Sequence, residues 1–469
     1  MNKSRFLRNV SANTLQTVVN QVFGLAIFYA LSKGIDKNLF GQINWALAVL
    51  LTSFGILTFG MDQVLVKKIA AGYNRQSVFS AYLHHVLISG FVFYGVLLIF
   101  YTLFPVYLTQ GAFLLFIGIG KLAIYFSTPF KQLSASLEKF RDLSRMSVVS
   151  NIVRGTTLLL LLFFHRISIP AILITFISGD LLELACSYFI ARRLLQTPFP
   201  FRWNKRKQIL LMRESLPQTG VVFFTAIMSR LDWILIGLII SSTKLAEYSF
   251  AYKIFEVSTL PLMILAPLMI PLFTRIEKRS EDLTSLSFFL EWQVILASLI
   301  GLMLNTCWVP VINFISDGKY GTVNVATILL LSLSMPLLYF NNYLWTIQFA
   351  RGNMRLIFFV MSVSLCVNIA GCGILIPIYK NEGAALAYFI TALVQAILYR
   401  LKKPFAIQHF RWRLTVWPLT ALVVGFLAFR YTSGTATHIS AAICLFLLVL
   451  YLSKSIRLKD WQLLQSLYK

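Results

Sequence analysis

The sequence is short of charge, and above all of negative charge. Only 13% of its 469 residues are charged, and 17 acidic residues stand against 42 Lys and Arg. Soluble domains have about 25% charged and roughly 45–50% apolar residues, whereas this chain is 58% hydrophobic. The composition excludes an ordinary soluble protein and indicates an all-α polytopic membrane protein.

Motifs for catalysis, metal binding and nucleotide binding are also missing. The five cysteines lie in apolar runs without CxxC spacing, so we interpret them as small buried hydrophobic residues. The stretch "GIGKL" (118–122) lacks the spacing and the Ser/Thr of a phosphate-binding loop, and the five histidines show no metal-ligand spacing. We therefore expect neither an enzyme nor a metal or cofactor, and transport driven by a gradient or by the substrate.

What the chain does have is a long series of apolar segments. A helix needs about 20 such residues to cross about 30 Å of hydrocarbon. The last two candidates are short, so the sequence predicts 12–14 transmembrane helices. The candidates are 10–32, 40–61, 79–103, 109–130, 144–165, 169–193, 216–240, 248–272, 286–310, 322–350, 355–378, 383–400, 412–430 and 437–453.

The distribution of Lys and Arg predicts the orientation. If the N-terminus is cytoplasmic, most of the 42 basic residues fall on inside segments, as the positive-inside rule requires. We therefore expect both termini to be cytoplasmic. Because the basic residues are spread over every inside loop, we exclude nucleic acid as a partner and expect contact with the anionic headgroups of the lipid bilayer.

The densest basic loop follows the sixth predicted helix and suggests a division into lobes. We expect an N-lobe (1–193, helices 1–6), a basic cytoplasmic linker (194–215) and a C-lobe (216–400, helices 7–12). Residues 401–469 form an expected extra helix pair and a basic tail. Two lobes of six helices around a central cavity are a common transporter plan.

Ionisable residues within the predicted helices are the candidate functional residues. Each charge at the centre of a helix costs about 2.5–3.5 kcal/mol on insertion scales, so these side chains must face one another or a wet cavity. The basic ones are Lys121, Arg154, Arg230 and Lys253, and the acidic ones are Asp180, Glu183, Asp232, Glu256 and, near the inner end of the second helix, Asp62.

Two interpretations of these charges stay open. They can pair as clamps between helices, for which Arg154 with Glu183 and Lys253 with Glu256 are candidates. Alternatively they line a water-filled central cavity with a net positive charge. Such a cavity suits an anionic headgroup because Arg binds phosphate oxygens bidentately and Lys acts as a point charge. Carboxylates in the same cavity could carry a coupling proton or sodium ion.

The segment "MSRLDWILIGLII" (228–240) poses this question most sharply. Arg230 and Asp232 are two residues apart and so point about 160° apart on a helix. They cannot both face one partner on a regular helix. We expect Arg230 to face the cavity and Asp232 to meet a neighbouring helix, with the opposite assignment as the alternative.

The longer segment "MSRLDWILIGLIISSTKLAEYSFAYKIFE" (228–256) resembles helices 7 and 8 of the polysaccharide-repeat-unit (O-antigen, Wzx-type) flippases. These belong to the multidrug/oligosaccharidyl-lipid/polysaccharide (MOP) exporter superfamily. The segments 40–70 and 381–390 resemble the same family. The chain departs from it at Glu247, where the family has Gly, and in its fourteen candidate helices. The matching residues in 228–256 are Arg230, Asp232, Gly237, Tyr248, Ala251, Lys253 and Glu256.

The resemblance implies a flippase that moves undecaprenyl-diphosphate-linked oligosaccharide across a bacterial inner membrane by alternating access. A polysaccharide polymerase and a chain-length regulator are the protein partners it implies. Under this interpretation Arg230, Lys253, Arg154 and Lys121 bind the diphosphate. Ion coupling or pairing falls to Asp232, Glu256, Asp62, Asp180 and Glu183.

Three other functions compete with this one. A lipid II flippase stays open because that branch carries an extra helix pair. A cation-coupled multidrug antiporter would favour an acidic, aromatic cavity, which the four intramembrane basic residues oppose. A glycan polymerase or ligase would need a large outer loop, and no predicted outer loop is long enough.

Overall fold

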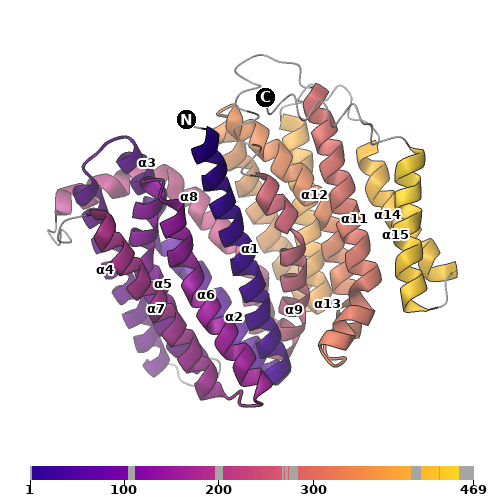
Figure 1. The fold of residues 1–469 in the computed structure, drawn as a ribbon, viewed down its shortest axis with the longest axis horizontal. Helices are drawn as coiled ribbons and strands as arrows, with labels where there is room; N and C mark the ends of the chain where they lie inside the picture. The colour runs from indigo at the N-terminus through magenta and orange to yellow at the C-terminus, as the bar shows by residue number, and fades with distance from the viewer. Residues whose placement is uncertain are drawn as a thin grey trace. The chain divides into compact units, whose positions relative to one another are not determined.

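The protein is helical throughout the part that the structure describes. The computed structural model describes residues 3–103, 111–195, 204–266, 269, 273, 284–402, 413–431 and 434–453, and every regular element in these ranges is a helix (Figure 1). The predicted all-α fold class is confirmed. The chain divides into two compact units, Met1–Ala246 and Glu247–Lys469.

The first unit is a bundle of long helices in which α5 packs against α2, α3, α4, α6 and α7. In this unit α5 and α6 both pack against α7, α1 packs along α6, and α2 packs against α8. The described helices are α1 (Lys3–Gly34), α2 (Lys37–Leu57), α3 (Met61–Ala70), α4 (Arg75–Leu103), α5 (Gly111–Ser136), α6 (Phe140–Phe163), α7 (Ile169–Leu195), α8 (Lys205–Leu235) and the π-helix η2 (Ile236–Ile240).

The second unit continues from α9 (Ser242–Ser258), whose first turn still belongs to the first unit. Here α11 packs against α12, α12 against α13, and α14 against both α11 and α15. The remaining helices are α11 (Thr284–Ile315), the short 3-10 helix η3 (Thr322–Asn324), α12 (Val325–Ala350), α13 (Met354–Lys402), α14 (Arg413–Tyr431) and α15 (Thr435–Leu452).

Local sequence explains where helices begin and end. The Asp36 carboxylate caps α2 by accepting hydrogen bonds from the N–H groups of Asn38 and Leu39, at 3.0 and 3.2 Å. Between α2 and α3 the chain passes through left-handed conformations at Phe59 (φ 49°) and Gly60 (φ 69°). This break separates α3 from the predicted helix 40–61 and carries Asp62 into a helix of its own.

By length and composition, ten described helices can cross a membrane, or eleven if the bent pair Ser242–Ser258 and Leu260–Ala266 is one span. This is fewer than the predicted 12–14, because α13 is counted once and α14 and α15 are short. Within α13 the backbone reverses at Lys380 (φ 53°, ψ −123°). Asn368 Nδ2 donates to Thr391 Oγ1 at 3.4 Å, whereas 23 residues of straight helix would span about 34 Å. The helix therefore folds back as two antiparallel halves, which correspond to the predicted helices 355–378 and 383–400.

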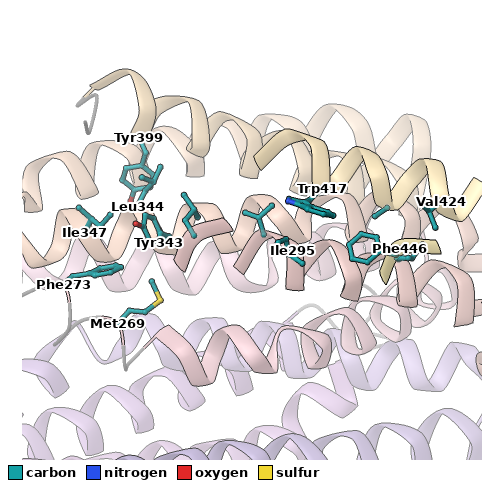
Figure 2. Close-up of a cluster of buried hydrophobic side chains, with 14 of the residues drawn as sticks. Met269, Phe273, Ile295, Tyr343, Leu344, Ile347, Tyr399, Trp417, Val424 and Phe446 are labelled. Carbon is teal, nitrogen blue, oxygen red and sulfur yellow. The ribbon is translucent and has the colours of Figure 1, made fainter. Parts of the chain in front are cut away.

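A hydrophobic core runs through the second unit (Figure 2). At one end Phe273 packs against the Tyr343 ring of α12, with ring centroids 5.3 Å apart. At the other end Trp417 of α14 meets Phe446 of α15 at 5.8 Å. The predicted extra helix pair is thus built into the core of this unit.

The predicted lobe boundaries stay a prediction. The structure groups α8, the expected seventh helix, with the first unit. Residues 196–203 of the expected linker 194–215 and the basic tail 454–469 lie outside the described residues. The expected cytoplasmic orientation of both termini likewise stays a prediction.

Candidate functional site

Three helices of the first unit bring opposite charges together around Asp180 of α7. Lys121 Nζ of α5 donates to Asp180 Oδ2 at 2.8 Å, and Arg154 NH1 of α6 lies 3.3 Å from Asp180 Oδ1. The Ser150 hydroxyl, one turn before Arg154, donates to the same Oδ1 at 2.6 Å. One carboxylate therefore holds two cations and a hydroxyl.

This Lys121–Asp180–Arg154 cluster is almost completely buried. The three side chains are 5%, 0% and 8% exposed, respectively. Arg154 is also held by its own helix, since its Nε donates to Ser150 O at 3.2 Å and its NH2 to Asn151 Oδ1 at 2.8 Å. A buried charge that loses its partner is costly, so these contacts depend on one another.

Small residues allow the three helices to approach one another. A Cβ atom at Gly120, beside Lys121, would lie 2.8 Å from Asp180 Oδ2. One at Gly179, beside Asp180, would lie 2.8 Å from Arg154 Cγ. A glycine next to a charged residue in an apolar helix was thus a signal in the sequence for this cluster.

A second ion pair joins α5 to α7 through Lys131 and Glu183. The prediction that Arg154 pairs with Glu183 is wrong, because Asp180 takes Arg154 and Lys131 takes Glu183. Lys131 follows the predicted helix 109–130, but α5 continues past Pro129 to Ser136 and carries it. Together the two sites hold three cations and two carboxylates, an excess of one positive charge.

The polar residues of the first helix join the same network. Asn151 Nδ2 of α6 donates to Asn20 Oδ1 of α1 at 3.0 Å. Nearer one end of these helices, Ser144 Oγ donates to Gln16 Oε1 at 3.2 Å. Asn20 is therefore linked to Arg154 through Asn151, and both amides of α1 tie it to α6.

Asp62 lies apart from these pairs, in the first turn of α3. Its Oδ1 atom is buried and accepts no hydrogen bond. Burial raises the pKa of the Asp62 carboxyl above its ordinary value of 3.8, and the nearby N–H groups of Gln63 and Asp62 itself oppose the rise only in part.

Arg230 and Asp232, both on α8, lie in different surroundings. The Arg230 guanidinium is partly exposed and lies 4.6 Å from the centroid of the Trp233 ring. Asp232 is 6% exposed, and its Oδ1 accepts from the Trp233 N–H at 2.9 Å. A π-helix follows directly, and such wide turns are frequent at functional sites.

In the second unit, Lys253 and Glu256 form an ion pair along α9. Lys253 Nζ lies 2.9 Å from Glu256 Oε2, one turn away, and both side chains are only partly buried. The structure thus pairs Lys121, Arg154 and Lys253 with carboxylates. Headgroup binding and ion coupling by these residues stay predictions. Among the described residues, no three His, Cys, Asp or Glu side chains are placed to hold a metal ion.

The fold is similar to those of known transporters. It matches the lipid II flippase MurJ in its inward closed conformation with a TM-score of 0.74 and 13% identity, covering 92% of this chain and 96% of that one. A multidrug resistance MATE family transporter in its inward-facing conformation matches with a TM-score of 0.61 and 11% identity, over 86% and 96%. A MOP superfamily transporter from Pyrococcus furiosus matches with a TM-score of 0.56 and 12% identity, over 85% and 96%.

At these identities the likeness shows the fold alone. No curated protein matches the chain in sequence. A sequence family described as "Polysaccharide biosynthesis protein" matches residues 6–277, which is more than half of the 469 residues. The chain is therefore a multi-pass membrane protein with the fold of the MOP transporters, and it belongs to the polysaccharide biosynthesis protein family.

Proposed function

We propose that this chain is a lipid-linked oligosaccharide flippase of the O-antigen type. It moves undecaprenyl-diphosphate-linked repeat units across a bacterial inner membrane by alternating access. Membership of the polysaccharide biosynthesis protein family supports a glycan substrate, and the MOP fold supports transport across a bilayer.

The observation that carries this proposal is the excess of positive charge inside the first unit. Lys121 and Arg154 share one carboxylate, Asp180, within helices that can span a membrane. The carboxylate lowers the cost of burying the two cations but does not neutralise both. The remaining charge favours an anion, and a diphosphate supplies oxygens for both a Lys ammonium and an Arg fork.

A lipid II flippase is the second candidate. The TM-score of 0.74 with MurJ supports it. So does an apolar cavity of about 340 Å³ in the second unit, lined by residues of α11, α12, α14 and α15 such as Gly301, Leu333 and Phe426. A cavity of this kind would accept part of a polyprenyl chain.

The test compares variants in the host strain, after deletion of the gene has abolished the surface polysaccharide. Lys121→Met leaves a neutral Asp180–Arg154 pair, so we expect normal protein abundance but at least tenfold less surface polysaccharide. Lys68→Met is the matched control because Lys68 lies on α3, which is not among the spanning helices, and pairs with Glu214 of α8 at 2.6 Å. We expect this control to retain full polysaccharide.

Three results test the headgroup site and separate the two candidate functions. Full polysaccharide from abundant Lys121→Met protein would exclude the cluster as the headgroup site. Polysaccharide unaffected by deletion of the gene would exclude the repeat-unit flippase. Rescue of growth in a strain depleted of its lipid II flippase would favour the second candidate. Neighbouring genes for glycosyltransferases and a polymerase would support repeat-unit export.

A further inference from the structure

The second unit contains a polar cavity that is lined mainly by amides and aromatic rings rather than by charged residues. Its volume is about 290 Å³, and it lies between α9 with the following segment Leu260–Ala266, α12, and the second half of α13. Three amides line it, Asn341, Asn342 and Gln395, together with the aromatic rings of Tyr252, Trp345 and Tyr388.

The amides leave acceptors unused inside the protein. Asn341 is 4% exposed, and its Nδ2 donates to Ala392 O at 2.8 Å and to Gln395 Oε1 at 3.3 Å. These two bonds fix the orientation of the amide, yet its Oδ1 is buried and accepts no hydrogen bond. Asn342 Oδ1 is in the same state. An unsatisfied buried acceptor costs about 1–3 kcal/mol, so two of them on residues that line one cavity point to a ligand that donates hydrogen bonds.

The aromatic rings around the cavity are held by their neighbours. The Tyr388 ring meets Tyr252 and Phe255 edge to face, with centroids 6.0 and 5.8 Å away. Trp345 stacks on Phe349, one turn along α12, at 5.0 Å. Rings fixed in this way offer preformed apolar surfaces beside the amides.

The charge of the cavity distinguishes it from the site in the first unit. Glu256 lines it, and the Lys253 ammonium, 2.9 Å away, compensates that carboxylate. The cavity therefore has no excess of positive charge to attract a diphosphate. Amide oxygens, one carboxylate and aromatic faces instead suit a neutral molecule with hydroxyl groups on its edge and C–H groups on its faces, which is the chemistry of a sugar ring.

We propose that this cavity is a saccharide subsite, which holds one sugar residue of the transported glycan. Its volume of about 290 Å³ is just below the roughly 300–1,000 Å³ of ligand pockets, so it fits one sugar residue and not a whole repeat unit. The hydroxyl groups of that sugar donate to Asn341 and Asn342, and its C–H face packs on Trp345 or Tyr388. This inference rests on the proposed function, since it assumes a lipid-linked glycan as the substrate.

The experiment uses the purified full chain in nanodiscs and two probes, undecaprenyl diphosphate and undecaprenyl diphosphate N-acetylglucosamine. Native mass spectrometry measures the affinity for each. We expect the unaltered protein to prefer the sugar-bearing lipid by about tenfold, roughly what one good hydrogen bond provides. Asn341→Ala and Trp345→Ala should each reduce this preference severalfold while leaving the affinity for undecaprenyl diphosphate unchanged.

Gln348→Ala is the matched control, because Gln348 is a buried amide on the same helix that bonds to Asn353 and does not line the cavity. We expect it to keep the preference. Equal binding of both lipids to the unaltered protein would overturn the subsite, as would variants that weaken both lipids alike. Lipid affinity that depends on sodium in the unaltered protein but not in Asn341→Ala, with the sugar preference intact, would show that the cavity is an ion site instead. Failure to bind either lipid would contradict the proposed function itself.

Discussion

Lys121 Nζ lies 2.8 Å from Asp180 Oδ2, in the buried contact between two helices that are apolar enough to cross a membrane. The same carboxylate also takes Arg154, so its removal and the removal of either cation are not equivalent changes. Losing Asp180 leaves two buried cations without their shared partner, whereas losing Lys121 leaves a neutral pair.

Asp180→Asn should therefore prevent accumulation of folded protein. Removing one partner of a buried ion pair costs about 3–5 kcal/mol, and here two cations lose the same partner. Fluorescence-detected size-exclusion chromatography of the detergent extract measures the folded fraction. Lys121→Met is the comparison and should give a peak near that of the unaltered chain. An Asp180→Asn protein with a normal peak and normal Tm would show that the cluster does not stabilise the fold.

The fold was largely predictable because one physical constraint dominates it. A bilayer requires apolar helices about 20 residues long, and all fourteen predicted segments correspond to a helix, a bent helix pair or one half of α13. The ends of the helices were less predictable, since they depend on local turns. The left-handed residues Phe59 and Gly60 separate α3, and α5 passes through Pro129 where a helix end was expected.

The sequence predicted which residues belong to the site better than it predicted which of them pair. Burial cost alone selected Lys121, Arg154, Asp180 and Glu183, but depth along a helix did not decide which carboxylate Arg154 meets. That choice depends on the rotation of α6 against α7, and the close approach at Gly179 sets it. The amides Asn341 and Asn342 were missed because a neutral polar residue in an apolar helix carries a smaller penalty than a charge.

Asp62→Asn should stabilise the protein at neutral pH. The pKa of Asp62 is raised in the folded state, so between 3.8 and that higher value the folded protein holds a proton that the unfolded chain has released. The free energy of unfolding therefore falls as the pH rises through this window, and it stays lower above it. Thermal unfolding in detergent should show a higher Tm for Asp62→Asn at pH 7.5 and a smaller difference at pH 4. Asp142→Asn, which removes the partner of Arg145 at 3.5 Å, is the control and should give no gain at pH 7.5. An equal Tm for Asp62→Asn and the unaltered chain at both pH values would show that the carboxyl is not strained by burial.

Gly41→Ala should destabilise the first unit. A Cβ atom at Gly41 of α2 would overlap the backbone oxygen of Ser242 at the start of α9, and backbone cannot rotate away as a side chain can. We expect a loss of about 1–3 kcal/mol, the usual cost of overpacking, measured as a lower Tm. Gly95→Ala is the matched control: it adds the same methyl group to α4, where the new Cβ would meet nothing within 4 Å beyond its own helix backbone, and should be neutral or stabilising by about 0.5–1 kcal/mol. Equal Tm values for the two variants would contradict the close packing of α2 on Ser242.

Charge reversal at Arg230 and Lys253 separates headgroup binding from pairing. If Lys253 only pairs with Glu256, the exchange Lys253→Glu/Glu256→Lys keeps an i, i+3 ion pair on α9 and should restore the surface polysaccharide that Lys253→Glu alone loses. If Lys253 binds a diphosphate, its position matters, and the exchange should stay at least tenfold below the unaltered chain. We expect Arg230→Glu to lower the surface polysaccharide at least tenfold, as in the second case, because the Arg230 guanidinium is partly exposed over Trp233. The measured quantity is surface polysaccharide divided by protein abundance.

Full polysaccharide from an abundant Arg230→Glu/Lys253→Glu protein would exclude both residues from binding the anionic headgroup. Tenfold lower abundance of that protein would instead assign them to the packing of the helices.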